Sequence, residues 1–180
     1  MLWAAYKIHK EDGGPALFSQ ERIGQDMCPF VVYKFRTMIV GADEQRDLLL
    51  RDKTVKKEYE RGAKLKYDPR VTHIGNILRR TSIDELPQLF NVLRGEMSLV
   101  GPRPLLQSDV DLCYGLAATR RIYSVKPGLT GLWQVSGRSD LDIKFRRKIN
   151  LYYARHRSLC LDFVILFRTE KALITRKGAY

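Results

Sequence analysis

The sequence predicts an α+β domain that is mainly helical and has a small sheet of short strands. Long stretches without proline are rich in strong helix formers, or repeat apolar residues at spacings of three and four, and these predict helices. Two short runs of β-branched and aromatic residues predict strands. A chain of 180 residues with 44% hydrophobic content has the length of one domain with a single core.

The two strands are expected at residues 16–18 and 30–35, where aromatic and β-branched residues gather. Residues 12–15, with the sequence DGGP, form a dense turn signal ahead of the first strand. Residues 24–29 connect the two runs, so we expect a hairpin-like pair.

The stretch over residues 42–66 is rich in Asp, Glu, Lys, Arg and Leu and has no proline, so it predicts a solvated helix or helical loop. An Asp-Pro pair at 68–69 interrupts it. Residues 74–80 carry apolar residues at spacings of three and four, and they predict a short amphipathic helix that ends in two arginines.

A second amphipathic helix is expected to bury one face over residues 86–93 and to end at Gly95. Its apolar residues follow the i, i+3, i+4, i+7 pattern and are Leu86, Leu89, Phe90 and Leu93. Residues 101–104 (GPRP) are stiff and extended, because two prolines fix φ. Residues 126–140 hold three glycines and a proline and cannot form a regular helix. Residues 142–177 predict two helices.

The charge is strongly basic: 32 Lys and Arg against 20 Asp and Glu give a net charge of +12. This excess implies a polyanionic surface or an anionic substrate, and nucleic acid, anionic lipid and a nucleotide diphosphate all qualify. Three dispersed cysteines without CxxC spacing argue against a disulfide framework or a zinc site and fit a reducing setting. No run approaches the roughly 20 apolar residues that cross a bilayer.

The N-terminus starts abruptly on apolar and aromatic side chains but is too short for a signal peptide and lacks a cleavage site. We expect residues 1–11 to be the remnant of a membrane-associated helix. Residues 12–180 are expected to form one catalytic domain, since no linker-like composition divides them.

Asp84 and Glu85 are the first candidates for chemistry. Ser82-x-x-Glu85 also matches a capping box, and acids at a helix start are favoured by the macrodipole, so a purely structural role is one interpretation. Pro87 counts against a cap by Ser82, because its ring would press on the preceding turn and kink the helix. If Asp84 is the cap instead, Pro87 falls at a position that needs no intrahelical N–H.

Two adjacent acids are able to divide the work of phosphoryl transfer. An ionised Asp84 close to arginines is a candidate nucleophile on phosphorus. Glu85 projects from a different side of the helix and is the candidate ligand for Mg²⁺, a hard cation that binds one or two carboxylates together with substrate phosphate oxygens.

Phosphoryl transfer also requires cations around the phosphate oxygens. Arg103 is held between two prolines, and Arg138 lies in a glycine-rich loop with exposed N–H groups. Lys34 and Arg36 share the strand face opposite Phe35. This arrangement is either the ordinary alternation of a strand or a basic wall that binds an anion. The candidate phosphate- and nucleotide-binding residues, each also consistent with a plain surface charge, are Lys34, Arg36, Arg79, Arg80, Arg103 and Arg138.

Aromatic and basic residues interleave over residues 145–157. This pattern suits an interfacial amphipathic helix, a nucleic-acid surface, or a helix half buried in its own core. No RRM, zinc-finger or helix-turn-helix signature supports nucleic acid. The competing hypothesis for the whole chain is a non-catalytic basic module that binds an anionic membrane or nucleic acid.

Five motifs follow one another in the chain: YKFRTM at 33–38, DPR at 68–70, LRRTSIDELPQL at 78–89, MSLVGPRP at 97–104 and KPGLTGLWQVSGR at 126–138. Together they closely resemble the bacterial sugar transferases, the monotopic polyprenyl-phosphate phosphoglycosyl transferases. The likeness runs from about Gly13 to the C-terminus. Residues 64–66 and 176–180 look most like the undecaprenyl-phosphate galactose phosphotransferases of that family.

The resemblance implies transfer of a sugar 1-phosphate from a UDP-sugar to undecaprenyl phosphate, with release of UMP, through a covalent phosphosugar on the aspartate that matches Asp84. Glu85 matches the family's metal-binding glutamate, which implies Mg²⁺ as cofactor. Arg79, Arg103 and Arg138 match arginines associated with the diphosphate and the nucleotide. Galactose is the expected sugar, with glucose next.

The resemblance also implies a setting. The reaction would begin exopolysaccharide, capsule or O-antigen synthesis at the cytoplasmic face of the bacterial inner membrane. The expected partner surface is an anionic membrane and not nucleic acid, and a homodimer is left open. The family normally begins with a re-entrant membrane helix, which is largely missing here. Its short strands are arranged around a small sheet, and interfacial amphipathic helices are expected.

Overall fold

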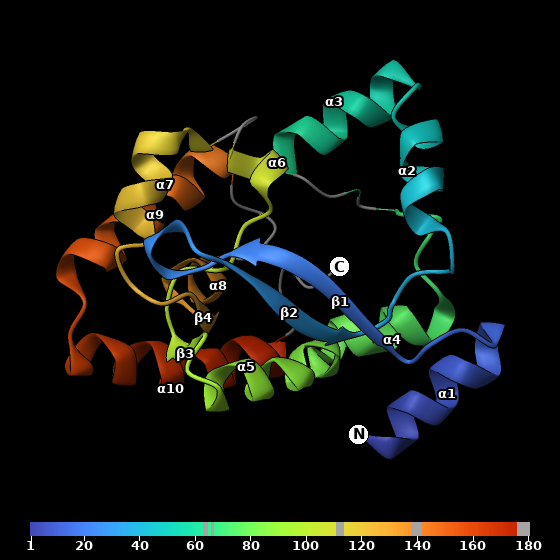
Figure 1. Ribbon diagram of the computed structural model, residues 1–180, viewed down its shortest axis with the longest axis horizontal. Helices are drawn as coiled ribbons and strands as arrows, with labels where there is room; N and C mark the ends of the chain where they lie inside the picture. Colours follow the sequence, from blue (N-terminus) through green and yellow to red (C-terminus); the bar gives the residue numbers. More distant parts are fainter. Residues whose placement is uncertain (63–64, 66, 111–113, 138–141, 176–180) are drawn as a thin grey trace.

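The computed structural model describes residues 1–62, 65, 67–110, 114–137 and 142–175. Figure 1 shows a mainly helical molecule with short strands near its centre. In chain order the elements are α1 (Leu2–Asp12), β1 (Leu17–Ile23), the 3₁₀ helix η1 (Gln25–Met27), β2 (Pro29–Phe35), α2 (Ala42–Leu49), α3 (Lys53–Gly62), α4 (His73–Thr81), the 3₁₀ helix η2 (Ile83–Gln88), α5 (Leu89–Leu93), β3 (Ser98–Val100), α6 (Gln107–Asp109), α7 (Leu116–Ile122), β4 (Gly128–Thr130), α8 (Leu132–Ser136), α9 (Ile143–His156) and α10 (Leu159–Thr175). The expected α+β class is confirmed.

The first sheet is the hairpin of β1 and β2. The strands are antiparallel, from the pair Leu17 and Phe35 to the pair Ile23 and Pro29, and η1 lies in their connection. The predicted pair is confirmed, but β1 continues well beyond the expected 16–18. Its additional residues are largely polar, so strand propensity alone gives them little signal.

The second sheet pairs β3 with β4 in parallel, with Ser98 beside Gly128. The backbones at Gly101 and Gly128 approach each other so closely that a Cβ on Gly128 would lie 2.0 Å from the backbone nitrogen of Gly101. Nothing local in the sequence predicts this pairing, because parallel partners are remote along the chain. It fixes the extended segment 101–104 against the loop over residues 126–140, which contains only the short α8 as helix in its described part.

The predicted helices are largely present. The described part of the stretch 42–66 contains two helices, because α2 ends at Leu49 and α3 begins at Lys53. Asp52 caps α3: its carboxylate accepts hydrogen bonds from the N–H groups of Thr54 and Val55. The amphipathic helix α4 begins with Thr72 as its cap, whose hydroxyl accepts from the N–H of Gly75 at 2.9 Å. Helices α9 and α10 confirm the two C-terminal helices.

The apolar core among the described residues is divided into three clusters rather than the single core expected. One joins the hairpin to α7 and α9, one joins α1 to β2 and α4, and one joins β3 to α9 and α10. Their buried members are Ile23, Leu105, Val110, Tyr114, Ile122, Tyr123 and Ile143; Ala4, Ile8, Phe35 and Leu78; and Val100, Val125, Tyr153 and Ile165. Helix α1 is therefore packed onto the domain by its Ala4 and Ile8 face.

The prediction of a buried apolar face over residues 86–93 is wrong. The apolar residues are exposed, at 40% for Leu86, 41% for Leu89, 56% for Phe90 and 83% for Leu93. The polar side of this segment faces inward because Asn91 is buried against β2. The Asn91 amide donates to the carbonyl of Val31 at 2.7 Å and accepts from the N–H of Tyr33 at 3.3 Å. These bonds satisfy backbone groups that β2 would otherwise leave unpaired.

Exposed apolar side chains also gather on α10. They are Leu159, Phe163, Val164, Leu166, Phe167, Leu173 and Ile174. In Figure 1, α10, α5, α4 and α1 lie along the lower edge of the view. Within the described ranges, no helix has both the length and the hydropathy to cross a membrane.

Helix α9 holds the interleaved aromatic and basic residues. Arg146, Asn150 and Tyr153 are buried, whereas Phe145 and Tyr152 are half exposed. Of the three interpretations of this segment, a helix half buried in its own core describes the structure.

Candidate active site

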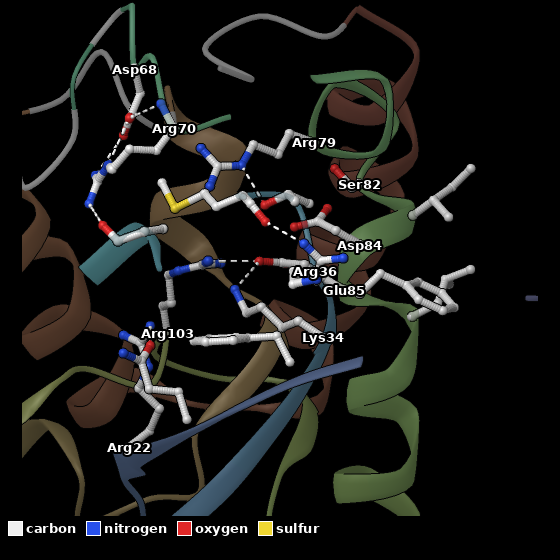
Figure 2. A pocket seen from close by; sticks show the side chains of 18 of the residues that line it. Arg22, Lys34, Arg36, Asp68, Arg70, Arg79, Ser82, Asp84, Glu85 and Arg103 are labelled. Atoms are coloured by element: carbon white, nitrogen blue, oxygen red, sulfur yellow. Dashed lines mark hydrogen bonds and ion pairs between the residues drawn. The ribbon is translucent and has the colours of Figure 1, made fainter. Parts of the chain in front are cut away.

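A cavity of about 840 Å³ lies between the hairpin, η2 and the C-terminal helices. Figure 2 shows charged side chains from several elements converging in it. The charged residues of its wall are Arg22, Lys34, Arg36, Asp43, Glu44, Arg46, Asp68, Arg70, Arg79, Asp84, Glu85 and Arg103. Part of the wall is apolar and includes Leu86, Leu99, Leu129, Leu166 and Leu173. The cavity wall therefore has a charged part, in which cations outnumber anions, and an apolar part.

A tight reversal between α4 and η2 brings the two carboxylates to this cavity. Ser82 ends α4 in the left-handed region, with φ 57° and ψ 17°, and makes no side-chain cap to η2. The capping-box interpretation is therefore wrong: the Glu85 carboxylate bonds to side chains across the cavity instead of to the backbone of Ser82. Asp84 and Glu85 lie in the first turn of η2.

Glu85 is held by two cations. Its Oε1 accepts from Lys34 Nζ at 3.0 Å and from Arg103 Nη2 at 2.7 Å, as the dashed lines of Figure 2 show. Burial acts to raise the pKa of Glu85, but the charges and hydrogen bonds of Arg103 and Lys34 outweigh it and hold the pKa well below its ordinary value. The Glu85 carboxylate is therefore ionised at physiological pH.

Asp84 differs from Glu85 in its contacts and in the direction of its pKa shift. It is 9% exposed, and its carboxylate makes no hydrogen bond or ion pair with any described residue. Burial, followed by the negative charge of Glu85, raises the pKa of Asp84 to about 6, although Lys34, Arg103 and Arg79 pull it down. At neutral pH the side chain is thus ionised, and among the described residues it is unpaired, inside a basic cavity.

The other predicted arginines have unequal positions. Arg79 lines the cavity and donates from Nε to Thr37 Oγ1 at 2.9 Å. Arg80 is exposed and absent from the cavity wall, because adjacent residues of a helix point about 100° apart. Its assignment to substrate phosphate is not supported by this position. Arg138 lies outside the described residues, as do residues 64, 66 and 176–180.

Lys34 and Arg36 do share a face opposite the buried Phe35, but they play different parts. Arg36 is paired with Asp12 at the end of α1 and donates to the carbonyls of Pro15 and Met38. Its charge is therefore committed within the protein. Burial lowers the pKa of Lys34, while Glu85 acts to raise it. Of the two cations, Lys34 is the one that contacts Glu85, at 3.0 Å.

Sequence reasoning missed three features of the wall. Asp68 and Arg70 of the DPR motif form a buried ion pair at 2.6 Å, and Arg70 also donates to the carbonyl of Ala42. Trp133 contributes an aromatic surface, with the Arg103 guanidinium 6.0 Å from its ring. Arg22 reaches the cavity from β1, and strand alternation was the signal for it, because Phe18, Gln20 and Arg22 all line the cavity.

The donor set is compatible with Mg²⁺. Within the described ranges no group of three or more His, Cys, Asp or Glu residues is suited to a metal. Two adjacent carboxylates are nevertheless what Mg²⁺ uses when substrate phosphates and water supply its other ligands. Oε1 of Glu85 already accepts two cationic donors, which leaves Oε2 and the Asp84 carboxylate.

A profile described as bacterial sugar transferase matches residues 1–176. The chain belongs to the bacterial sugar transferase family. The resemblance carried by the five motifs is therefore confirmed, and the expected class of enzyme, a transferase, is the class of this family.

Relatives within the family include the expected subgroup. The undecaprenyl-phosphate galactose phosphotransferase of Salmonella typhimurium is 45% identical over 186 residues, covering 100% of this chain and 37% of that protein. The UDP-galactose-lipid carrier transferase of Erwinia amylovora is 45% identical, covering 94% of this chain and 35% of that protein. The exopolysaccharide production protein ExoY of Rhizobium meliloti is 43% identical, with 94% and 74% covered. The chain spans little more than a third of the first two.

Proposed function

We propose that this chain transfers a hexose 1-phosphate from a UDP-sugar to undecaprenyl phosphate, through a covalent phosphosugar on Asp84. The observation that carries the proposal is the Asp84 carboxylate, which is buried and unpaired among the described residues and lies in a cavity lined by Lys34, Arg79 and Arg103. A buried carboxylate without a partner is costly to keep ionised. A nucleophile needs that freedom, because a paired oxygen would first have to break its bonds.

In the first half reaction, a carboxylate oxygen of Asp84 attacks the phosphorus that carries the sugar. The new O–P bond forms as the bond from that phosphorus to the bridging oxygen breaks. The electron pair stays on the bridging oxygen, which leaves as part of UMP. Arg79, Arg103 and Lys34 supply positive charge around the phosphoryl oxygens during this step.

In the second half reaction, a phosphate oxygen of undecaprenyl phosphate attacks the same phosphorus. The bond to Asp84 breaks, its electron pair returns to the carboxylate, and undecaprenyl-diphosphate-sugar is released. No group other than Asp84 has to change its covalent state, so the enzyme returns to its starting form.

Mg²⁺ is part of the proposal, with Oε2 of Glu85 as its protein ligand. When bound, it would neutralise charge on the diphosphate oxygens. Glu85 suits a metal ligand because Arg103 and Lys34 keep it ionised at any physiological pH.

The lipid half of the proposal rests on apolar surface. Leu86, Leu166 and Leu173 line the cavity and are exposed, so the apolar part of the wall continues onto the exposed apolar residues of α5 and α10. Contiguous exposed apolar surface marks a site of contact with protein or membrane. We propose that this surface lies on the cytoplasmic face of a bacterial inner membrane, where a polyprenyl phosphate would enter.

Galactose is the sugar we propose, with glucose as the alternative, because two of the relatives carry galactose in their names. The product would then start an exopolysaccharide, capsule or O-antigen. The UDP-sugar, undecaprenyl phosphate and an anionic membrane surface are the proposed partners.

Intact mass spectrometry after incubation with Mg²⁺ and UDP-galactose, UDP-glucose or their N-acetyl forms tests the proposal. A hexose phosphate adduct should appear on the wild-type protein and be absent from Asp84→Asn. Asp43→Asn, at an exposed cavity-rim carboxylate, is the matched control and should retain the adduct. An adduct that persists in Asp84→Asn, or no adduct with any of these sugars, would refute the covalent mechanism.

A further inference from the structure

Arg22 is a partly buried cation that has no acidic partner among the described residues. Its guanidinium donates to two neutral acceptors, Gln20 Oε1 at 2.7 Å and the carbonyl of Pro104 at 3.5 Å. It forms no ion pair with a carboxylate in the described part of the chain. Burying a charge is costly unless an opposite charge accompanies it, so this arrangement points to an anion supplied by a ligand.

The guanidinium lies where two cavities meet. A smaller cavity of about 150 Å³ adjoins the large one, and both are lined by Arg22, Arg103 and Trp133. Figure 2 shows Arg22 beside Arg103, on the side away from Glu85. Asp109 is the one carboxylate among the residues that line the smaller cavity, and it lies beyond ion-pair distance of Arg22.

The electrostatics agree with this geometry. Burial, followed by the like charge of Arg103, lowers the pKa of Arg22 to about 10, while Asp109 acts in the opposite direction. Arg22 therefore remains a cation at neutral pH. Two neighbouring guanidiniums repel each other unless an anion lies between them, and phosphate is the anion whose geometry a guanidinium fork matches.

We infer that Arg22 and Arg103 together bind the nucleotide-side phosphate of the diphosphate donor, at the boundary of the two cavities. The inference rests on the proposed function and assigns a binding residue to it. The two phosphates of a diphosphate share one bridging oxygen, so their sites must adjoin. Arg103 is suited to this junction, because its Nη2 is bonded to Glu85, next to the nucleophile, while Arg22 lies on its other side.

Arg22 would act most strongly on the departing group. When the bond to the bridging oxygen breaks, that oxygen takes the electron pair and UMP gains negative charge. A cation fixed beside the nucleotide phosphate stabilises this charge as it develops. Arg22 should thus favour both UMP binding and the rate of the first half reaction, and it should leave the attack by the lipid phosphate unaffected.

Binding of UMP, uridine and inorganic phosphate to the full chain, measured by calorimetry, tests the assignment. In Arg22→Gln the Kd for UMP should rise by about 10- to 100-fold, as expected for loss of a charged hydrogen bond, while uridine binding stays the same. Arg22→Lys should recover part of the affinity. Arg51→Gln, at an exposed arginine, is the control and should match the wild type.

Two further readouts separate the inference from a structural role and from the proposed function. Because Arg22→Gln removes a partly buried charge with no described acidic partner, its urea midpoint should stay the same or rise. Adduct formation at saturating UDP-galactose should still occur, only more slowly. Equal UMP affinity in Arg22→Gln and wild type, an equal loss for uridine, or a defect confined to the lipid half reaction would each overturn the inference. Absence of adduct from the wild type would instead refute the proposed function and leave the UMP comparison valid.

Discussion

Glu85 accepts hydrogen bonds from both Lys34 and Arg103, whereas Asp84, the preceding residue, is bonded to neither. The two carboxylates occupy the same turn of η2 and the same cavity, yet their pKa values move in opposite directions. Two titratable neighbours whose pKa values are pushed apart are the usual mark of a division of chemical labour.

The rate of adduct formation should depend on pH through Asp84. The nucleophile must be ionised, and burial has raised its pKa to about 6, so the single-turnover rate should be constant above about pH 7 and fall about tenfold per unit well below pH 6. UMP release from pH 4.5 to 8 measures this, with circular dichroism to show that the protein stays folded. A rate independent of pH down to 4.5 would contradict it.

Asp84→Asn should stabilise the protein at neutral pH. The folded-state pKa of about 6 exceeds the ordinary 3.8, so the folded protein binds the proton more tightly than the unfolded chain, and stability is lost as pH rises towards 6. The variant escapes this loss and should gain up to about 3 kcal/mol above pH 6. Urea unfolding at pH 8 and pH 4 measures the difference, which should nearly vanish at pH 4.

Lys34 and Glu85 should be energetically coupled. Lys34→Met leaves the Glu85 carboxylate buried with one cation fewer, and should lower the free energy of unfolding by about 2 kcal/mol. In a Glu85→Gln background the same change should cost much less, giving a coupling energy of about 1–3 kcal/mol in a double-mutant cycle. A coupling near zero would show that the 3.0 Å contact does not hold Glu85.

The exposed apolar surface should govern membrane association. Phe90 on α5 and Phe167 on α10 are 56% and 73% exposed, so Phe90→Glu combined with Phe167→Glu should weaken binding to anionic vesicles at least tenfold with an unchanged urea midpoint. Leu48→Glu on α2, at a residue 57% exposed, is the control and should bind like the wild type. Equal binding by all three proteins would exclude this surface.

Gly75 should not tolerate a side chain. A Cβ there would lie 2.0 Å from the carbonyl oxygen of Thr37, so Gly75→Ala must push α4 away from the hairpin and disturb the Arg79 bond to Thr37. The expected cost is about 1–3 kcal/mol of unfolding free energy, together with slower adduct formation. Asn76→Ala, at the next, exposed position of α4, should leave both unchanged. Normal stability of Gly75→Ala would mean that α4 and the hairpin do not pack this closely.

Features that depend on neighbours in the chain were predictable. The hairpin, α4 and the common face of Lys34 and Arg36 follow from strand and helix periodicity, which is a property of a few consecutive residues. The candidacy of Asp84 and Glu85 followed in the same way from residue type and spacing, and the five motifs led to the family.

Features that depend on remote residues were not predictable. Periodicity over residues 86–93 indicates that the segment has two faces but not which face is inside, and the buried amide of Asn91 reversed the expected orientation. Residue type likewise does not say which arginine already has its charge neutralised. Arg36 is paired with Asp12, which lies far earlier in the chain, whereas Arg22 is paired with no described carboxylate.

The order of residues in the chain was therefore enough to identify the chemical groups, their local secondary structure and the family. Folding in three dimensions assigned their states: which carboxylate is paired, which arginines have a carboxylate partner among the described residues, and which apolar face is exposed. The physical reason is that burial and ion pairing arise between groups far apart in sequence, and these long-range terms set the pKa of Asp84 and Glu85 in opposite directions although the two residues are adjacent.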